Sequence, residues 1–356
     1  MVGAFIAAGS ALAMAILLTP TLIRSFTRSA FAREQRVERL GSDHARPVTP
    51  TMGGVAIVAA VWFGYLLAHL LTHRPFTAVA LLVLCLSTVL AAVGLLDDLL
   101  KLRRRSRSGV ASISKAVGQV LTAMVFGVLA LRFSNAQGLA PASGQLSFVR
   151  DFAPLPFGVV GFVVLFVLVV YTWSSAVNIT DGLDGLAAGA SGLVVGVYVI
   201  IALWQLRNQC VTTVATTCYE VPAPLDVAIV AAAALGGCIG FLWWNAAPAR
   251  MQLGATGSLA LGGLIAGLSV VTRTELLVLV IGGVFVVEFV SVAVQVAVFR
   301  VSHRRVFRMA PFHHHFELGG WAEATVIIRL WLLGGICAAV GLALFYNEWL
   351  GASATG

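Results

Sequence analysis

The chain has 356 residues, of which 59% are hydrophobic and only 11% charged, with a formal net charge of +8 and a mean hydropathy of +0.96. A water-soluble protein cannot carry so much apolar surface without aggregating. This composition therefore excludes a disordered chain, a disulfide-stapled secreted domain and a large soluble enzyme. We expect one all-α polytopic membrane domain over 1–356.

Ten apolar runs are long enough to cross a bilayer. Helices are expected because lipid offers backbone polar groups no other partner. The eighth run is short and weakly apolar, and the first lacks a basic leader and a cleavage pattern, so it is interpreted as a retained span. The runs lie near 3–23, 52–71, 78–96, 113–131, 157–177, 183–205, 226–246, 257–272, 276–299 and 325–346.

Basic residues predict the orientation of the spans. Alternate loops, within 24–46, 101–115, 250 and 300–308, hold 17 of the 23 Lys and Arg residues. By the positive-inside rule these loops are cytoplasmic and both termini lie outside. The net charge is then explained by topology, so no nucleic-acid partner is expected.

The cysteines fit the same topology. Cys85, Cys238 and Cys337 fall inside apolar runs and are expected to act as small inert hydrophobes. Cys210 and Cys218 share one long outward loop, where a disulfide and two free thiols both remain open.

Unusual polar residues gather at the predicted cytoplasmic ends of the spans. Asp97 and Asp98 end the third run, where two neighbouring carboxylates repel each other unless a cation or a proton intervenes. Lys101 follows one helical turn later. A simple ion pair at a helix end is the alternative interpretation.

A second acidic segment, Asn178-Ile179-Thr180-Asp181-Gly182-Leu183-Asp184-Gly185, separates two spans. If the segment is helical, Asp181 and Asp184 share a face. One or two carboxylates with water and substrate phosphate suit Mg²⁺. An ordinary Asp-Gly turn before a helix is the alternative.

Three further features lie on the same side or near it. Thr256 or Ser258 could cap a helix whose free N–H groups bind an anion. His313, His314 and His315 suit a phosphate-rich ligand, with zinc as the alternative. Glu288, a lone acid inside a span, is either a proton relay or the partner of a buried polar group such as Gln295.

Together these motifs resemble the phospho-N-acetylmuramoyl-pentapeptide transferases, within the polyprenyl-phosphate N-acetylhexosamine-1-phosphate transferases. The likeness covers nearly the whole chain, and the triple histidine with the following Gly320-Trp321 favours this branch. The resemblance rests on Pro50-Thr51-Met52-Gly53-Gly54, Asp97-Asp98 with Lys101, 178–186, 257–263, 309–311 and 313–317.

The resemblance implies an enzyme of the bacterial inner membrane. It would transfer phospho-MurNAc-pentapeptide from UDP-MurNAc-pentapeptide to undecaprenyl phosphate, with Mg²⁺, to give lipid I and UMP in peptidoglycan synthesis. A homodimer is implied by the resemblance alone. The implied catalytic residues are Asp97, Asp98 and His313, the metal ligands Asp181 and Asp184, and the substrate-binding residues Thr51, Lys101, Asn178, Asp181, Asp184, Asn245, His314 and His315.

The sequence departs from the family pattern in three places. Ala255 stands where the family has the aspartate expected to hold magnesium, and Gln252 stands where it has a phenylalanine. Arg46, Pro47 and Val48 replace an expected lysine and glycine, and Arg does not simply substitute for Lys. Two alternatives follow, a catalytically impaired paralogue that binds lipid phosphate or acts as a scaffold, and a proton-coupled transporter using Glu288.

Overall fold

The computed structural model describes residues 1–28, 49–104, 112–135, 138–151, 158–210 and 218–354, and in these ranges the chain is almost entirely helical. Ten of the described helices are long and apolar enough to span a membrane, as predicted. The helices are α1 Val2–Arg28, α3 Gly54–Thr72, α4 Ala78–Arg104, α5 Ser112–Arg132, α6 Gly158–Thr180, α7 Leu186–Arg207, α8 Pro224–Asn245, α9 Gly254–Val271, α10 Leu277–Ile281, α11 Gly283–Ser302, α12 Phe312–Glu317 and α13 Glu323–Ala354.

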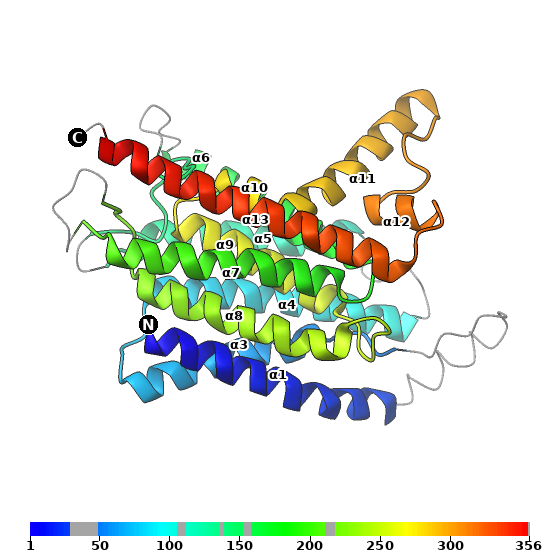
Figure 1. Cartoon of the computed structure of the whole chain (residues 1–356), viewed down its shortest axis with the longest axis horizontal. Coiled ribbons are helices and arrows are strands. Elements are labelled where there is room, and N and C mark those ends of the chain that lie inside the picture. Colours follow the sequence, from blue (N-terminus) through cyan, green and yellow to red (C-terminus); the bar gives the residue numbers. More distant parts are fainter. Residues whose placement is uncertain (29–48, 105–111, 136–137, 152–157, 211–217, 355–356) are drawn as a thin grey trace.

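The bundle has two ends. Figure 1 shows the N-terminus and the C-terminus at one of them, here called the terminal end. Helices α4, α6 and α8 finish at the opposite end, and α12 lies there too (Figure 1). We call this second end the carboxylate end, after the acidic residues that it holds.

Helix α9 is the centre of the bundle. It packs on α3, α4 and α6, and 17 of its 18 residues are buried. This is the run that appeared short and weakly apolar. A helix surrounded by protein needs less apolar surface than one facing lipid, and small residues let its neighbours approach. A Cβ on Gly262 would lie 2.4 Å from the backbone of Ser174.

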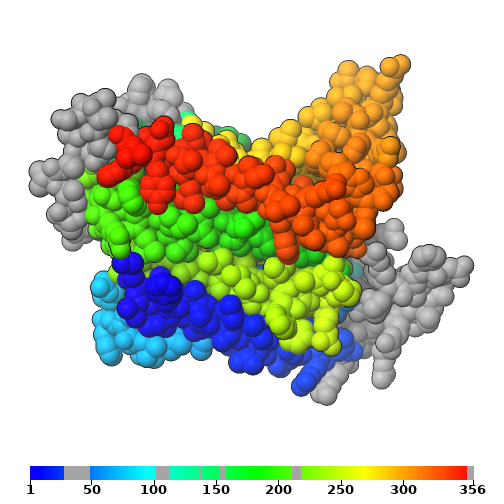
Figure 2. Space-filling view, viewed as in Figure 1, coloured from blue at the N-terminus to red at the C-terminus, as the bar shows by residue number. Residues whose placement is uncertain are grey.

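The ninth predicted span is not one continuous helix. It breaks at Gly282 into the short α10 and the long α11. A Cβ on Gly282 would lie 2.4 Å from the Trp173 ring, so glycine allows the chain to turn against this indole. Beyond the break, α11 leaves the bundle and projects from the body of the protein, as Figures 1 and 2 show.

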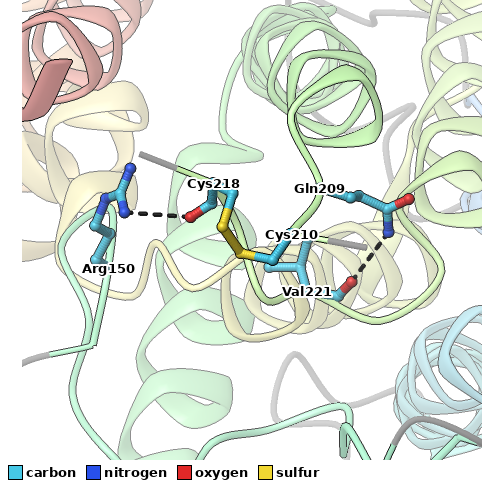
Figure 3. Close-up of a disulfide and its surroundings, with 5 residues drawn as sticks. All are labelled: Arg150, Gln209, Cys210, Cys218 and Val221. Atoms are coloured by element: carbon cyan, nitrogen blue, oxygen red, sulfur yellow. Dashed lines mark hydrogen bonds between the residues drawn. A yellow bond between two sulfur atoms is a disulfide. The ribbon is translucent and has the colours of Figure 1, made fainter. Parts of the chain in front are cut away.

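A disulfide between Cys210 and Cys218 closes the connection from α7 to α8 at the terminal end (Figure 3). Beside it, Arg150 donates from Nη1 to the Cys218 carbonyl at 3.2 Å and pairs through Nε with Glu348 of α13 at 2.9 Å. Of the two alternatives that the sequence left open, the structure forms the bond. The contacts of Arg150 connect this loop to the last turns of α13.

The terminal end also holds a buried acid, Glu275, in the connection between α9 and α10. Its side chain is 4% exposed, and burial raises its pKa from 4.5 to about 8. The neighbouring Arg273 donates to the carbonyls of Ala140 and Pro141, so its guanidinium is engaged by backbone. Burial therefore favours the protonated form of Glu275.

Candidate functional site

The carboxylate end brings together segments that are far apart in sequence. Residues 50–54 run beside the loop before α9, where Gln252 N–H donates to the Pro50 carbonyl and Gly53 N–H donates to the Gln252 carbonyl, both at 2.9 Å. The backbones approach closely, since a Cβ on Gly54 would lie 2.1 Å from the nitrogen of Gly257. Thr51, in this segment, is half-buried at the rim.

Asp98 caps the start of α9. Its carboxylate accepts the N–H groups of Ala255 at 3.2 Å and Thr256 at 2.9 Å, and the Thr256 hydroxyl donates to it at 2.7 Å. The prediction that Thr256 or Ser258 caps this helix was wrong. The residue at the N-cap position of α9 makes no side-chain hydrogen bond to the helix. The Asp98 carboxylate, from α4, accepts the free N–H groups of the first turn instead.

Asp97 faces two lysines. Lys101, one turn on in α4, lies 2.8 Å from its Oδ2, and Lys115 at the start of α5 lies 3.6 Å from the same atom. From the sequence, Lys115 is only one of the basic residues that predict the topology, because nothing in its local pattern shows that α5 returns beside Asp97. Two ammonium groups therefore flank one buried carboxylate at the carboxylate end of the bundle.

The segment after α6 forms a turn over 181–185 and not the helix that would align its acids. Burial, followed by the charges of Asp98 and Asp184, raises the pKa of Asp181 well above its ordinary value. Asp184 accepts the Ala249 N–H at 2.9 Å, and its own N–H approaches Glu323 of α13 at 3.5 Å. Asp181 thus has two acidic neighbours, Asp98 and Asp184, whose negative charge favours a cation there.

Two predicted binding residues hold the walls of the site. Asn178 accepts a hydrogen bond from the Ser258 hydroxyl at 3.0 Å, which ties α6 to α9. Asn245, buried at the end of α8, donates to the Met251 carbonyl at 2.9 Å and so closes the loop of residues 246–251.

The first of the three histidines is fully buried. His313 Nδ1 lies 3.1 Å from an oxygen of Glu288 in α11, and its ring lies against Gly182 of the acidic turn. Glu288 is thus the partner of a buried polar group, as one of the two alternatives predicted, but that group is His313 and not Gln295. Gln295 instead accepts the N–H groups of Val306 and Phe307 and holds the loop after α11.

The other two histidines have partners within their own segment. His314 hydrogen-bonds Glu317 one turn on, and its ring centre lies 4.2 Å from that of His313. His315 accepts the Arg308 N–H at 3.1 Å and stacks on Phe312. Of the three, His313 is the one that the structure places against the acidic turn.

Two of the positions that depart from the family pattern lie at the start of α9, and the others lie outside the described residues. Ala255 is in the first turn of α9 and Gln252 is in the loop before it, beside Asp98 and residues 50–54. Arg46, Pro47 and Val48 lie outside the described residues. Within the described residues, no three His, Cys, Asp or Glu side chains are grouped as ligands of one metal ion.

Comparison with known proteins gives concordant matches. The family model of the glycosyl transferase family 4 matches residues 80–273. A phospho-N-acetylmuramoyl-pentapeptide-transferase of Rhodococcus opacus is 58% identical over 351 residues, covering 97% of this chain and 98% of that protein. Proteins of the same name from Mycobacterium avium and Saccharopolyspora erythraea are 56% and 55% identical, over 98% and 97% of each chain.

Proposed function

The chain belongs to the phospho-N-acetylmuramoyl-pentapeptide transferases of the glycosyl transferase family 4, and on this premise we propose how its carboxylate end performs the reaction. The protein transfers phospho-MurNAc-pentapeptide from its UDP carrier to undecaprenyl phosphate in a bacterial membrane. An oxygen of the lipid phosphate bonds to the phosphorus that carries the sugar. The bond from that phosphorus to the bridging oxygen breaks, and UMP leaves with this oxygen.

The observation that carries the proposal for the site is the position of Asp97 between Lys101 and Lys115. Phosphoryl transfer depends mainly on positioning and on charge stabilisation, which ammonium groups supply. In our proposal the two lysines bind the phosphate of the lipid as it arrives at the boundary of the membrane. Asp97 holds both lysines in place and receives the proton of the lipid phosphate when that group is protonated.

Magnesium suits the chemistry of the donors around Asp181. Mg²⁺ binds through one or two carboxylates together with substrate phosphates. Burial and then the charges of Asp98 and Asp184 raise the pKa of Asp181, and a divalent cation would relieve this negative charge. When bound, the ion would neutralise charge on the diphosphate. Asp181 would hold it with Asp184, while Asp98 is engaged by α9 and residue 255 has no side-chain oxygen.

The remaining polar residues are proposed to bind the nucleotide sugar. Asn178, Asn245 and Thr51 line the wall that α6, α8 and residues 50–54 form. His313, against the acidic turn, would contact the diphosphate, with His314 beside it. His315 would act on substrate only through the loop that it holds.

We further propose that the carboxylate end is cytoplasmic and the terminal end is outside. The excess of basic residues in the loops of the carboxylate end supports this orientation. The disulfide at the opposite end supports it independently, because disulfides persist in oxidising compartments. A nucleotide sugar from the cytoplasm and a lipid phosphate from the bilayer would then meet at the carboxylate end.

The test is UMP release by the purified protein in lipid nanodiscs with undecaprenyl phosphate, UDP-MurNAc-pentapeptide and Mg²⁺. We expect turnover that requires both substrates and falls at least 100-fold in Asp97→Asn. A matched control is Asp151→Asn, which changes an acid at the terminal end. Equal turnover by Asp97→Asn and the unmodified protein would overturn the proposed role of the lysine–aspartate cluster.

A further inference from the structure

Glu288 is a fully buried acid within α11, and its two carboxylate oxygens differ in their hydrogen bonding. One of them, Oε2, accepts from His313 Nδ1 at 3.1 Å and lies 3.4 Å from the His313 backbone nitrogen. The other, Oε1, is buried with no hydrogen-bond partner in the described part of the protein. A carboxylate inside an apolar helix is costly, so its retention calls for a specific partner.

The opposite side of His313 is also unsatisfied. Its Nε2 is buried and has no hydrogen-bond partner among the described residues. A Cβ on Gly182 would lie 2.3 Å from this atom, so Nε2 lies directly against the turn that carries Asp181 and Asp184. One ring nitrogen is thus held by α11, and the other faces the acidic turn.

If the Glu288–His313 pair only joined α11 to α12, we would expect more of its polar atoms to be hydrogen-bonded. Buried polar groups in folded proteins are almost always hydrogen-bonded, and exceptions often mark functional sites. Hydrophobic residues of the same volume would join α11 to α12 at least as well as a buried polar pair. The unsatisfied atoms, one on each partner, therefore favour a role in the reaction over a role in packing.

We propose that Glu288 is a positioning residue for the transfer reaction. Its carboxylate accepts from Nδ1–H and balances the charge of the doubly protonated ring, so that His313 presents an Nε2–H donor to the substrate diphosphate above the acidic turn. A carboxylate behind a histidine orients the ring and stabilises its protonated form in the same way in hydrolases. The inference rests on the proposed function, because it assumes that the diphosphate binds at this turn.

The first experiment compares Glu288→Gln with Glu288→Leu, using kcat and KM per folded protein in nanodiscs. Glutamine keeps the shape and an acceptor oxygen, whereas leucine removes the acceptor. We expect kcat to fall about tenfold in Glu288→Gln and about 100-fold in Glu288→Leu, the range seen when partners of this kind are removed. KM for the nucleotide sugar should change less than threefold. Glu275→Gln, the same change in a buried acid at the terminal end, should retain full kcat.

A double-mutant cycle separates positioning from stability. In a His313→Leu background, Glu288→Leu should cause no further loss of kcat, because its partner is already absent. The double variant also avoids leaving one polar partner alone, so it should fold even where Glu288→Leu is poorly stable. Independent losses of kcat that multiply in the double variant would overturn the proposal.

A readout without turnover keeps the inference distinct from the proposed function. In protein with ¹⁵N-labelled histidine, the His313 ring should give a protonated Nδ1 and a protonated Nε2, and Glu288→Leu should leave only one of the two protonated. The same protonation state in both proteins would overturn the role of Glu288. Absence of UMP release from the unmodified protein would instead count against the proposed function, while the protonation result would still stand.

Discussion

The carboxylate of Asp98 in α4 holds the backbone of Thr256 in α9, with the N–H at 2.9 Å and the hydroxyl at 2.7 Å. The residue implied as catalytic is therefore also the cap of the central helix. A carboxylate at a helix N-terminus is stabilised by the free N–H groups and by the helix dipole. Its neighbour Asp97 instead pairs with two lysines.

This difference predicts separate effects of two adjacent substitutions. Asp98→Asn should lower the free energy of unfolding by about 1–2 kcal/mol, the range for loss of a helix cap, and should also reduce activity. Asp97→Asn should reduce activity with a smaller change in stability, since one of its lysines is substantially exposed. Thermal unfolding in detergent, followed alongside UMP release, distinguishes them. Equal stability of the two variants would contradict the capping role.

Lys115 is the basic residue that we expect to bind the lipid phosphate together with Lys101. Lys115→Ala should raise KM for undecaprenyl phosphate about tenfold, which corresponds to about 1.4 kcal/mol of binding, and leave KM for the nucleotide sugar within threefold. Lys115→Arg should recover only part of the loss, because a planar guanidinium does not replace a compact ammonium. A larger effect on the nucleotide sugar than on the lipid would assign this lysine to the other substrate.

Ala255 gives a prediction about magnesium. Ala255→Asp adds a carboxylate in the first turn of α9, beside Asp98 and near Asp181. We expect the Mg²⁺ concentration for half-maximal activity to fall about tenfold, because a further oxygen ligand becomes available. Mn²⁺ binding followed by electron paramagnetic resonance should tighten in parallel. Ala255→Asn, without the added charge, is the control, and unchanged Mn²⁺ affinity in Ala255→Asp would show that the ion binds away from residue 255.

The buried acid Glu275 predicts a pH dependence of stability. Because burial raises its pKa from 4.5 to about 8, the folded protein retains a proton that the unfolded chain releases. Its contribution is fully present below about pH 4.5, falls as the pH rises toward 8, and is constant above it. Glu275→Gln should therefore raise the melting temperature at pH 8.5 more than at pH 5. The exposed Glu220→Gln should show no such difference.

The proposed orientation predicts which side of the membrane can reach Cys210 and Cys218. In intact spheroplasts, reduction followed by a membrane-impermeant maleimide should label these two thiols. A single cysteine introduced at Ser302, at the end of α11 near the carboxylate end, should be labelled only after the membrane is opened. The reverse labelling pattern would show that the carboxylate end lies outside, opposite to the proposed orientation.

Much of the fold was predicted because the length of an apolar run is enough to identify a membrane span. The ten spans and the two groups of acids at one end follow from local pattern. The break at Gly282 was not predictable, because it depends on the Trp173 ring from another helix. In the same way, a weakly apolar run gives no indication that α9 is the buried centre, since burial is decided by its neighbours.

The site shows the same division. The motifs identified Asp97, Asp98, Asp181 and His313 correctly as residues gathered at one end of the bundle. The pairing of Asp97 with Lys101 within α4 was also expected, whereas the partners from other helices were missed. Lys115 approaches Asp97 through the return of α5, and Glu288 reaches His313 across the loop after α11. Sequence spacing describes neighbours along a helix, whereas these pairs are set by how helices pack.

The close backbone contacts at the start of α9 limit how this enzyme can be altered. A Cβ on Gly94 would lie 2.2 Å from the Ala255 carbonyl oxygen, and one on Gly54 would collide with Gly257. Three helices therefore meet there without intervening side chains and cannot slide to suit a different ligand. Gln252 and Ala255, which differ from the family pattern, lie beside these close backbone contacts. Redesign of substrate or metal preference should exchange side chains at these two positions and leave the glycines untouched.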